Sequence, residues 1–146
     1  MSKKWFLIAN SSEAKVYLSD TDGQELSLHD TLLHPESRMK GSNIASDRPG
    51  HYASRGDGHG SFVEKTDPKD YEADRFATEI GHYLKNAHNK NQYKELVIAA
   101  SPHFHGLIKK HLERHVEETV VKHIEKDLTG LATNQIKKTI TNYMKA

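Results

Sequence analysis

The 146-residue sequence contains no cysteine, which excludes a disulfide framework, a thiolate zinc site and a cysteine nucleophile. No apolar run approaches the roughly 20 residues that a membrane-spanning helix needs, and the N-terminal stretch has too few apolar residues for a signal-peptide core. The formal net charge is only +1, so the chain as a whole is not an electrostatic nucleic-acid binder. We therefore expect a cytoplasmic protein without a membrane span, in which any nucleic-acid contact comes from a local patch.

The chain is also poor in apolar residues, which make up 35% of it, yet its length is that of one ordinary domain. We expect a single domain over residues 1–146, interrupted by one long loop at about residues 35–66. This stretch holds five of the nine glycines and few large apolar side chains. A structureless loop of this length is uncommon inside a compact domain and is usually functional or disordered.

The first 34 residues predict three meandering antiparallel strands. Trp5–Ala9 is a continuous apolar run, the pattern of a strand buried on both faces. Apolar and polar residues alternate over Ala14–Ser19 and again over Leu26–His34, as in half-buried strands. Asn10–Ser12 and Thr21–Gly23 supply the connecting turns, since Asn, Ser and Asp-Gly are strong turn signals.

Helical spacing begins after the long loop, where Asp67 is a natural N-cap and Pro68 a natural first helical residue. A polar connection at Asn86–Gln92 is expected to end this helix. Glu72 and Glu79 lie off its apolar stripe, so we expect both on the solvated face. The stripe consists of Ala73, Phe76, Ala77, Ile80, Tyr83, Leu84 and Ala87.

The last third of the chain predicts strand, helix, strand and helix. Leu96–Ala100 is a second apolar run, typical of a central strand, and Ser101-Pro102 repeats the cap-plus-proline start of a helix. The stretch Val116–Leu128 fits either a helix or a strand. We interpret Thr119–Glu125 as a strand, because the order of elements then makes sense, and Thr133 as the cap of a last amphipathic helix.

The predicted order is three antiparallel strands, helix, strand, helix, strand, helix. The two buried runs would be neighbours at the centre of the sheet, covered by helices. This is the layout of a ribonuclease-H-like α/β domain with a mixed five-stranded sheet. Since a fold does not fix a function, the candidate sites are argued separately.

Metal-dependent chemistry has little support in the sequence. Two-metal phosphodiester cleavage needs carboxylates at the ends of the central strands, and neither buried run ends in Asp or Glu. His103 and His105 lie two apart, and His111 and His115 lie four apart on the predicted helix, a spacing that can bring two imidazoles to one metal. However, HLERH matches neither zinc-protease pattern, and partly buried packing histidines are the plainer interpretation. We expect no metal, no cofactor and no catalytic residues.

The turns that follow the two central strands predict a pocket. In open α/β sheets, ligands favour the carboxyl ends of strands where neighbouring connections diverge. A helix N-terminus there also suits an anion or a phosphate, although Ser101 is most simply an N-cap. A serine hydrolase would need a base and an orienting acid, and no GxSxG elbow is present. The expected strand-end pocket comprises Asn10, Ser11, Ser101 and His103.

The long loop is the other candidate site. Arginine and lysine with glycine and an aromatic side chain suit contacts to the backbone and bases of RNA. Acidic residues in the loop leave it a formal charge of only +1, and a plain connecting loop is the alternative. The candidate RNA- or partner-binding residues are Arg38, Lys40, Arg48, Tyr52, Arg55 and His59.

Five ordered motifs carry a family resemblance. They are HPESR at 34–38, SDRPG at 46–50, DPK…YEADRFA at 67–77, SPHFHGLIKKHL at 101–112 and EKDLT at 125–129. Together they span essentially the whole chain, which resembles the bacterial host attachment protein family. The family name implies a role in attaching bacteria to host cells.

That family is also similar to the middle domain of archaeal and eukaryotic peptide-chain release factors, a ribonuclease-H-like fold. In those factors the loop between the third strand and the first helix carries a Gly-Gly-Gln motif that enters the ribosomal peptidyl-transferase centre. The corresponding place here holds Gly56-Asp57-Gly58-His59-Gly60. Since the glutamine is absent, the resemblance implies a release-factor-like fold but not peptidyl-tRNA hydrolysis.

Three functional hypotheses remain open from the sequence. The first, which we favour, is a non-catalytic protein that binds the ribosome or structured RNA through the loop. The second is a protein-interaction factor that supports attachment to host cells. The third is a small hydrolase that uses the strand-end turns. The sequence leaves the oligomeric state open.

Overall fold

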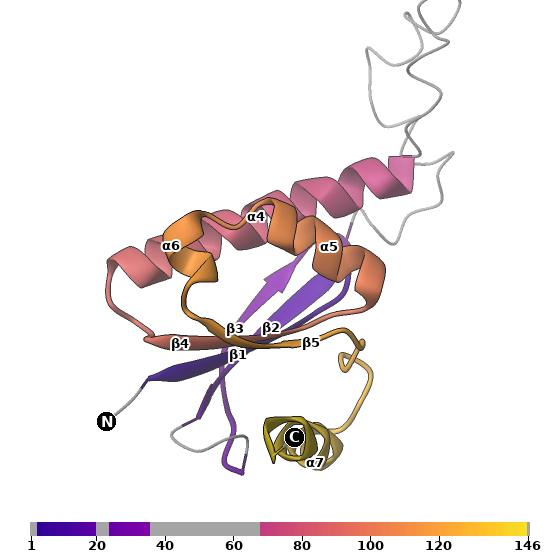
Figure 1. The fold of residues 1–146 in the computed structure, drawn as a ribbon. Helices are drawn as coiled ribbons and strands as arrows, with labels where there is room; N and C mark the ends of the chain where they lie inside the picture. The colour runs from indigo at the N-terminus through magenta and orange to yellow at the C-terminus, as the bar shows by residue number, and fades with distance from the viewer. Residues whose placement is uncertain (1–2, 20–23, 36–67, 146) are drawn as a thin grey trace, which may run out of the picture.

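The computed structural model describes residues 3–19, 24–35 and 68–145 and shows an open five-stranded sheet with helices on both faces (Figure 1). The order across the sheet is β3-β2-β1-β4-β5. The strands are β1 (Lys4–Ala9), β2 (Glu13–Ser19), β3 (Ser27–Leu33), β4 (Glu95–Ala99) and β5 (Val120–Ile124). The helices are α4 (Pro68–Asn89), α5 (Pro102–Lys110), α6 (Arg114–Glu117) and α7 (Thr133–Lys145).

The sheet is mixed, as expected. β1 pairs antiparallel with β2, and β2 with β3, so the first three strands form the predicted meander. β4 lies parallel to β1 and to β5, which places the two apolar runs side by side at the centre. The carboxyl ends of β1, β4 and β5 therefore meet at one edge of the sheet.

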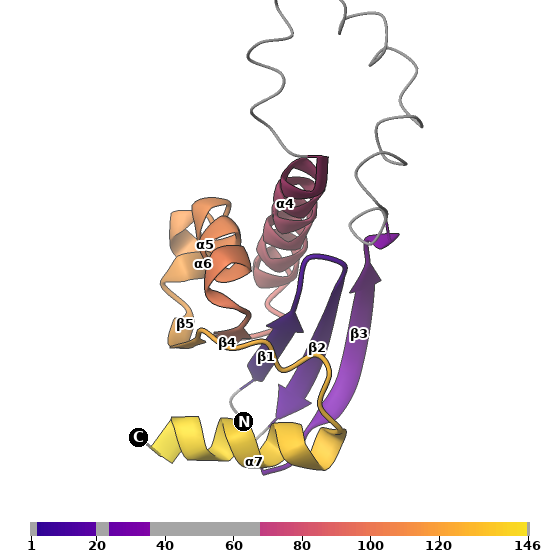
Figure 2. The same cartoon turned by 90° about the vertical axis from the view of Figure 1, so that its right-hand side faces the viewer.

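The alternation of side chains along β1 divides the core between the two faces. Trp5 and Leu7 face α4, α5 and α6, while Phe6 and Ile8 face α7, and all four are buried. Figure 2 shows this layering, with α7 on the opposite side of the sheet from the other helices. A strand buried on both faces must be apolar throughout, which explains the continuous run in the sequence.

The structure corrects several expected boundaries. α4 continues to Asn89, into the expected polar connection at Asn86–Gln92, because Ala87 is still buried against the core. Thr133 is the first residue of α7 rather than its cap. The strand interpretation of Thr119–Glu125 is confirmed by β5. The expected turn at Thr21–Gly23 and the expected N-cap Asp67 lie outside the described residues.

The histidine spacings also have a different meaning in the structure. α5 ends at Lys110, so His111 occupies its C-cap and His115 lies on the separate helix α6. The ring of His111 turns towards α4, with Nε2 2.8 Å from Asp74 Oδ1. His103 and His105 are both on α5, where His103 is exposed and His105 is buried. The prediction that His111 and His115 form an i, i+4 pair on one helix was therefore wrong.

Candidate functional site

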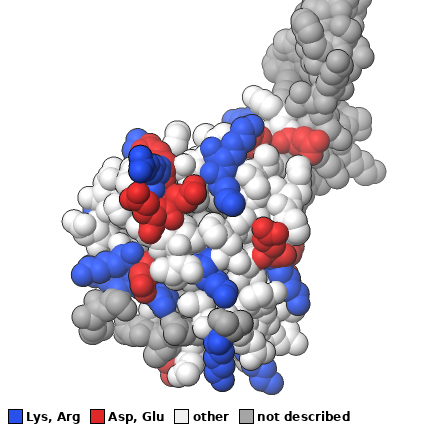
Figure 3. All heavy atoms as spheres, viewed as in Figure 1, with Lys and Arg blue, Asp and Glu red and all other residues white. Residues whose placement is uncertain are grey.

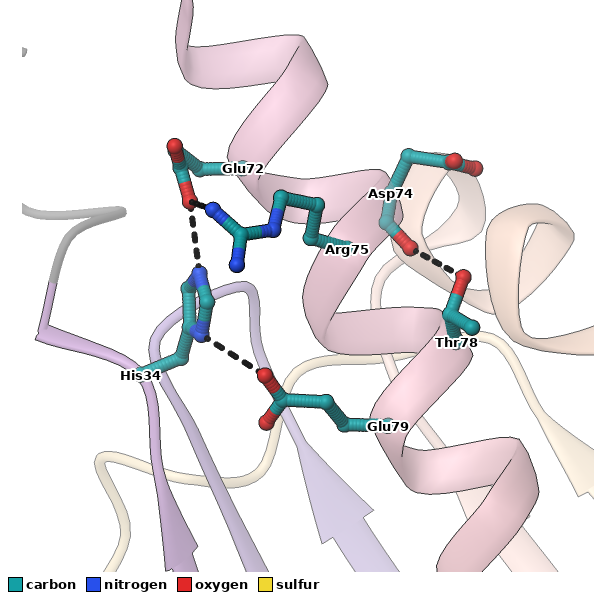
Figure 4. A network of polar contacts seen from close by, with 6 residues as sticks. All are labelled: His34, Glu72, Asp74, Arg75, Thr78 and Glu79. Carbon is teal, nitrogen blue, oxygen red and sulfur yellow. Dashed lines mark hydrogen bonds and ion pairs between the residues drawn. The ribbon is translucent and has the colours of Figure 1, made fainter. Parts of the chain in front are cut away.

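A buried histidine–carboxylate hydrogen bond lies where the chain leaves β3 for the long loop. His34 follows β3 directly, and its Nε2 lies 2.8 Å from Oε1 of Glu72 on α4 (Figure 4). His34 is 4% exposed and Glu72 only 1% exposed, so the expectation of a solvated Glu72 was wrong. The other ring nitrogen of His34 lies 3.5 Å from Oε1 of Glu79, which is half-exposed. The imidazole also stacks on Phe76, with ring centroids 5.3 Å apart.

This pair joins the two sides of the long loop at its base. Glu72 lies in the second turn of α4, the helix that follows the loop, whereas His34 directly precedes it. The contact therefore fixes where the loop leaves and re-enters the fold. The six loop residues proposed from the sequence lie outside the described residues, namely Arg38, Lys40, Arg48, Tyr52, Arg55 and His59.

The strand-end residues expected from the sequence do come together around one pocket. Its volume is about 360 Å³, and it opens at the edge where β1 and β4 end. Asn10, Ser11, Ser101 and His103 all line it. We call it the strand-end pocket, and its remaining lining residues are Asp70, Ala73, Phe104 and Asp127.

Asn10 organises one wall of the strand-end pocket. Its Oδ1 accepts hydrogen bonds from the amides of Ser12 and Glu13, at 2.8 and 2.9 Å, and so closes the turn between β1 and β2. Its Nδ2 donates to Thr129 Oγ1 at 2.9 Å, and that hydroxyl donates to Asp127 Oδ1 at 2.6 Å. One asparagine therefore fixes both the turn and the loop after β5.

Ser101 and His103 form the other wall, at the start of α5. Ser101 occupies the N-cap position as predicted, but its hydroxyl makes no capping hydrogen bond. His103 Nε2 lies 3.9 Å from Asp70 Oδ1, and both side chains are largely exposed. Among the described residues no hydrogen bond joins a pocket serine to His103. This wall therefore lacks the bonded hydroxyl–imidazole pair that characterises an activated serine.

Two carboxylates of the strand-end pocket were missed by the sequence reasoning. Asp70 comes from the first turn of α4, and Asp127 from the loop after β5. Both lie within motifs that carried the family resemblance, which was the available signal. Within the described ranges, no group of three or more His, Asp or Glu side chains is arranged to hold a metal ion.

A second histidine contact lies away from this pocket, between α5 and β5. His123 Nδ1 and His105 Nε2 are 3.0 Å apart, and the two rings meet edge to face. Burial lowers the pKa of His105, and the neighbouring His123 and Lys109 lower it further while Glu125 opposes. Burial also lowers the pKa of His123, again with Lys109, against Glu117 and Glu125.

Acidification is expected to destabilise the fold through this histidine pair. Because both pKa values are lowered, the unfolded chain binds more protons than the folded one as the pH falls below about 6.5. The contribution of the pair to the free energy of unfolding should therefore be constant above that pH and decrease below it. Urea unfolding at pH 7 and pH 5 measures the decrease, which should be smaller in His123→Ala. An equal decrease in His123→Ala would show that the histidine pair is not the cause of the acid sensitivity.

The charges of the described surface are mixed. On the face seen in Figure 3, lysine and arginine side chains alternate with acidic ones instead of forming one basic area. None of the described helices is long and apolar enough to cross a membrane. On the face seen in Figure 3, the described residues therefore form no continuous basic surface.

Comparisons with known proteins agree with the resemblance seen in the sequence. A family model described as "Protein required for attachment to host cells" matches residues 5–140. No curated protein matches the chain. An archaeal translation termination factor, aRF1, is similar at 12% identity and a TM-score of 0.45, covering 98% of this chain and 39% of that one. A structure described as an archaeal protein is similar at 13% identity and a TM-score of 0.45, covering 98% and 38%. The chain thus spans about two fifths of the length of either structure.

Proposed function

The chain belongs to the family of proteins required for attachment to host cells, and we propose that it acts there as a non-catalytic factor that binds the ribosome or another structured RNA. Residues 36–67 carry the contact in this proposal. The observation that supports it is an arginine- and glycine-rich segment that lies between His34 and α4, where His34 and Glu72 are hydrogen-bonded to each other.

The chemistry of the segment suits RNA. Arg38, Arg48 and Arg55 can each contact phosphates or stack on bases, and Lys40 adds a further cation. Tyr52 offers a ring on which an unpaired base can stack.

The fold supplies the anchoring that such a segment needs. The His34–Glu72 contact fixes the end of β3 against α4. The entropy of closing the loop is therefore already lost when the domain folds, before any RNA binds. The strand-end pocket lies at the same end of α4, because Asp70 lines it.

The test is sedimentation of tagged protein with cell lysate through sucrose gradients at low and high salt. We expect the wild type to migrate with ribosomal particles at low salt and to be released as salt rises. The triple variant Arg38→Ala, Arg48→Ala, Arg55→Ala should stay at the top of the gradient. In a direct titration of purified ribosomes, it should reduce the salt slope of log K by about 3.

A matched control removes three positive charges elsewhere. Lys137→Ala, Lys138→Ala, Lys145→Ala changes α7, on the other face of the sheet from α4, by the same total charge. This control should migrate like the wild type. A wild type that stays at the top at both salt concentrations would refute the proposal and favour a protein partner. Equal loss in both variants would show a general charge effect and would also refute the loop as the contact.

A further inference from the structure

The contact between His105 and His123 has features of a chelating site. His105 Nε2 and His123 Nδ1 lie 3.0 Å apart, with ring centroids separated by 4.8 Å. His105 is 1% exposed. His123 is exposed on the edge strand β5, so solvent reaches the pair from one side.

We propose that His105 and His123 together bind a late first-row divalent transition-metal ion, in a site independent of the proposed RNA contact. An ion about 2.0–2.1 Å from each imidazole nitrogen, with an angle of about 90–109° at the metal, places the two nitrogens about 2.8–3.4 Å apart. The observed 3.0 Å lies within this range. The separation of the two nitrogens therefore fits a shared ion.

Both ligands are carried by regular elements, which keeps them in place. His105 lies in α5 between the buried residues Phe104 and Ile108. His123 is paired with Ile98 of β4 in the parallel register. A site whose ligands are held by a helix and a strand loses little freedom when the ion binds.

The proton balance of binding is simple. A neutral imidazole carries one proton, which can sit on either nitrogen. Metal binding requires that the two facing nitrogens be unprotonated, so each ring then carries its proton on its other nitrogen. No net proton is released when both rings start neutral, and the ion replaces the hydrogen bond between them.

The surroundings determine which ions bind. Glu125 acts electrostatically on both rings and favours a cation, whereas Lys109 opposes it. No third His, Asp or Glu side chain of the described part of the chain completes a cage, so water fills the remaining positions. Two imidazoles and water suit Cu²⁺ best, then Ni²⁺ and Zn²⁺, and exclude Mg²⁺, which prefers oxygen ligands.

The test is calorimetric titration of untagged protein with Cu²⁺, Zn²⁺ and Mg²⁺, together with ¹⁵N-resolved NMR spectra at substoichiometric Cu²⁺. We expect tight binding of Cu²⁺, weaker binding of Zn²⁺ and none of Mg²⁺. Paramagnetic broadening should centre on residues near 105 and 123. His123→Ala should weaken Cu²⁺ binding by more than about 100-fold, because it removes one of two ligands.

His103→Ala is the matched control, since it removes an exposed histidine from the same helix without touching the pair. It should bind Cu²⁺ like the wild type and show the same broadening. Unchanged affinity in His123→Ala, or broadening centred on other histidines, would overturn the proposal and leave the pair as a hydrogen bond only. Because His123 is an exposed strand residue, this variant should fold, which its amide spectrum verifies.

Discussion

Glu72→Ala is expected to lower the free energy of unfolding by about 1–3 kcal/mol, as is typical when a buried polar group loses its hydrogen-bond partner. The carboxylate is 1% exposed and lies 2.8 Å from Nε2 of His34, which is itself buried. The variant leaves the imidazole without this partner and opens space beside it. Urea denaturation measures the change, with an unchanged m-value showing that the same structure unfolds.

Glu79→Ala is the matched control, because Glu79 contacts the same imidazole from the solvent side. Its Oε1 lies 3.5 Å from His34 Nδ1, and its side chain is 51% exposed. An exposed pair of this kind contributes at most about 1 kcal/mol. If Glu79→Ala costs as much as Glu72→Ala, burial does not determine the strength of the contact and the account of the loop base is wrong.

The strand-end pocket shows how far sequence reasoning reaches. Asn10 and Ser101 could be placed there because each follows an apolar run, and parallel neighbours end at the same edge. Asp70 and Asp127 could not be placed, because they come from a helix start and a loop whose positions depend on tertiary packing. The function of the pocket remains a prediction.

The two histidine contacts could not be predicted from the sequence for a related reason. His34 and Glu72 are 38 positions apart, and His105 and His123 are 18 apart. No periodic pattern links residues across such distances. Local periodicity correctly predicted the helices and strands. It also suggested a helix that continues through His111 and a solvated Glu72. Both predictions failed because periodicity contains no information on which neighbour covers a polar side chain.

Gly81→Ala is expected to lower the free energy of unfolding by about 2 kcal/mol, in the range typical of overpacking. Helix propensity alone would give the opposite sign, a gain of about 1 kcal/mol. A Cβ at position 81 would lie only 2.6 Å from the backbone oxygen of His111. That residue is held in place, since its ring bonds to Asp74 on α4 at 2.8 Å. The C-cap of α5 must therefore move away from α4, which thermal or urea unfolding will detect.

Gly106→Ala separates this packing effect from helix propensity. Gly106 lies within α5, is exposed, and has no atom within 4 Å of the position that a Cβ would take. The same substitution should therefore stabilise the protein here by about 0.5–1 kcal/mol. The two variants should thus change stability in opposite directions. If both variants gained stability by a similar amount, α4 and the end of α5 would not be in close contact. The packing that places His111, α5 and one wall of the strand-end pocket would then have to be revised.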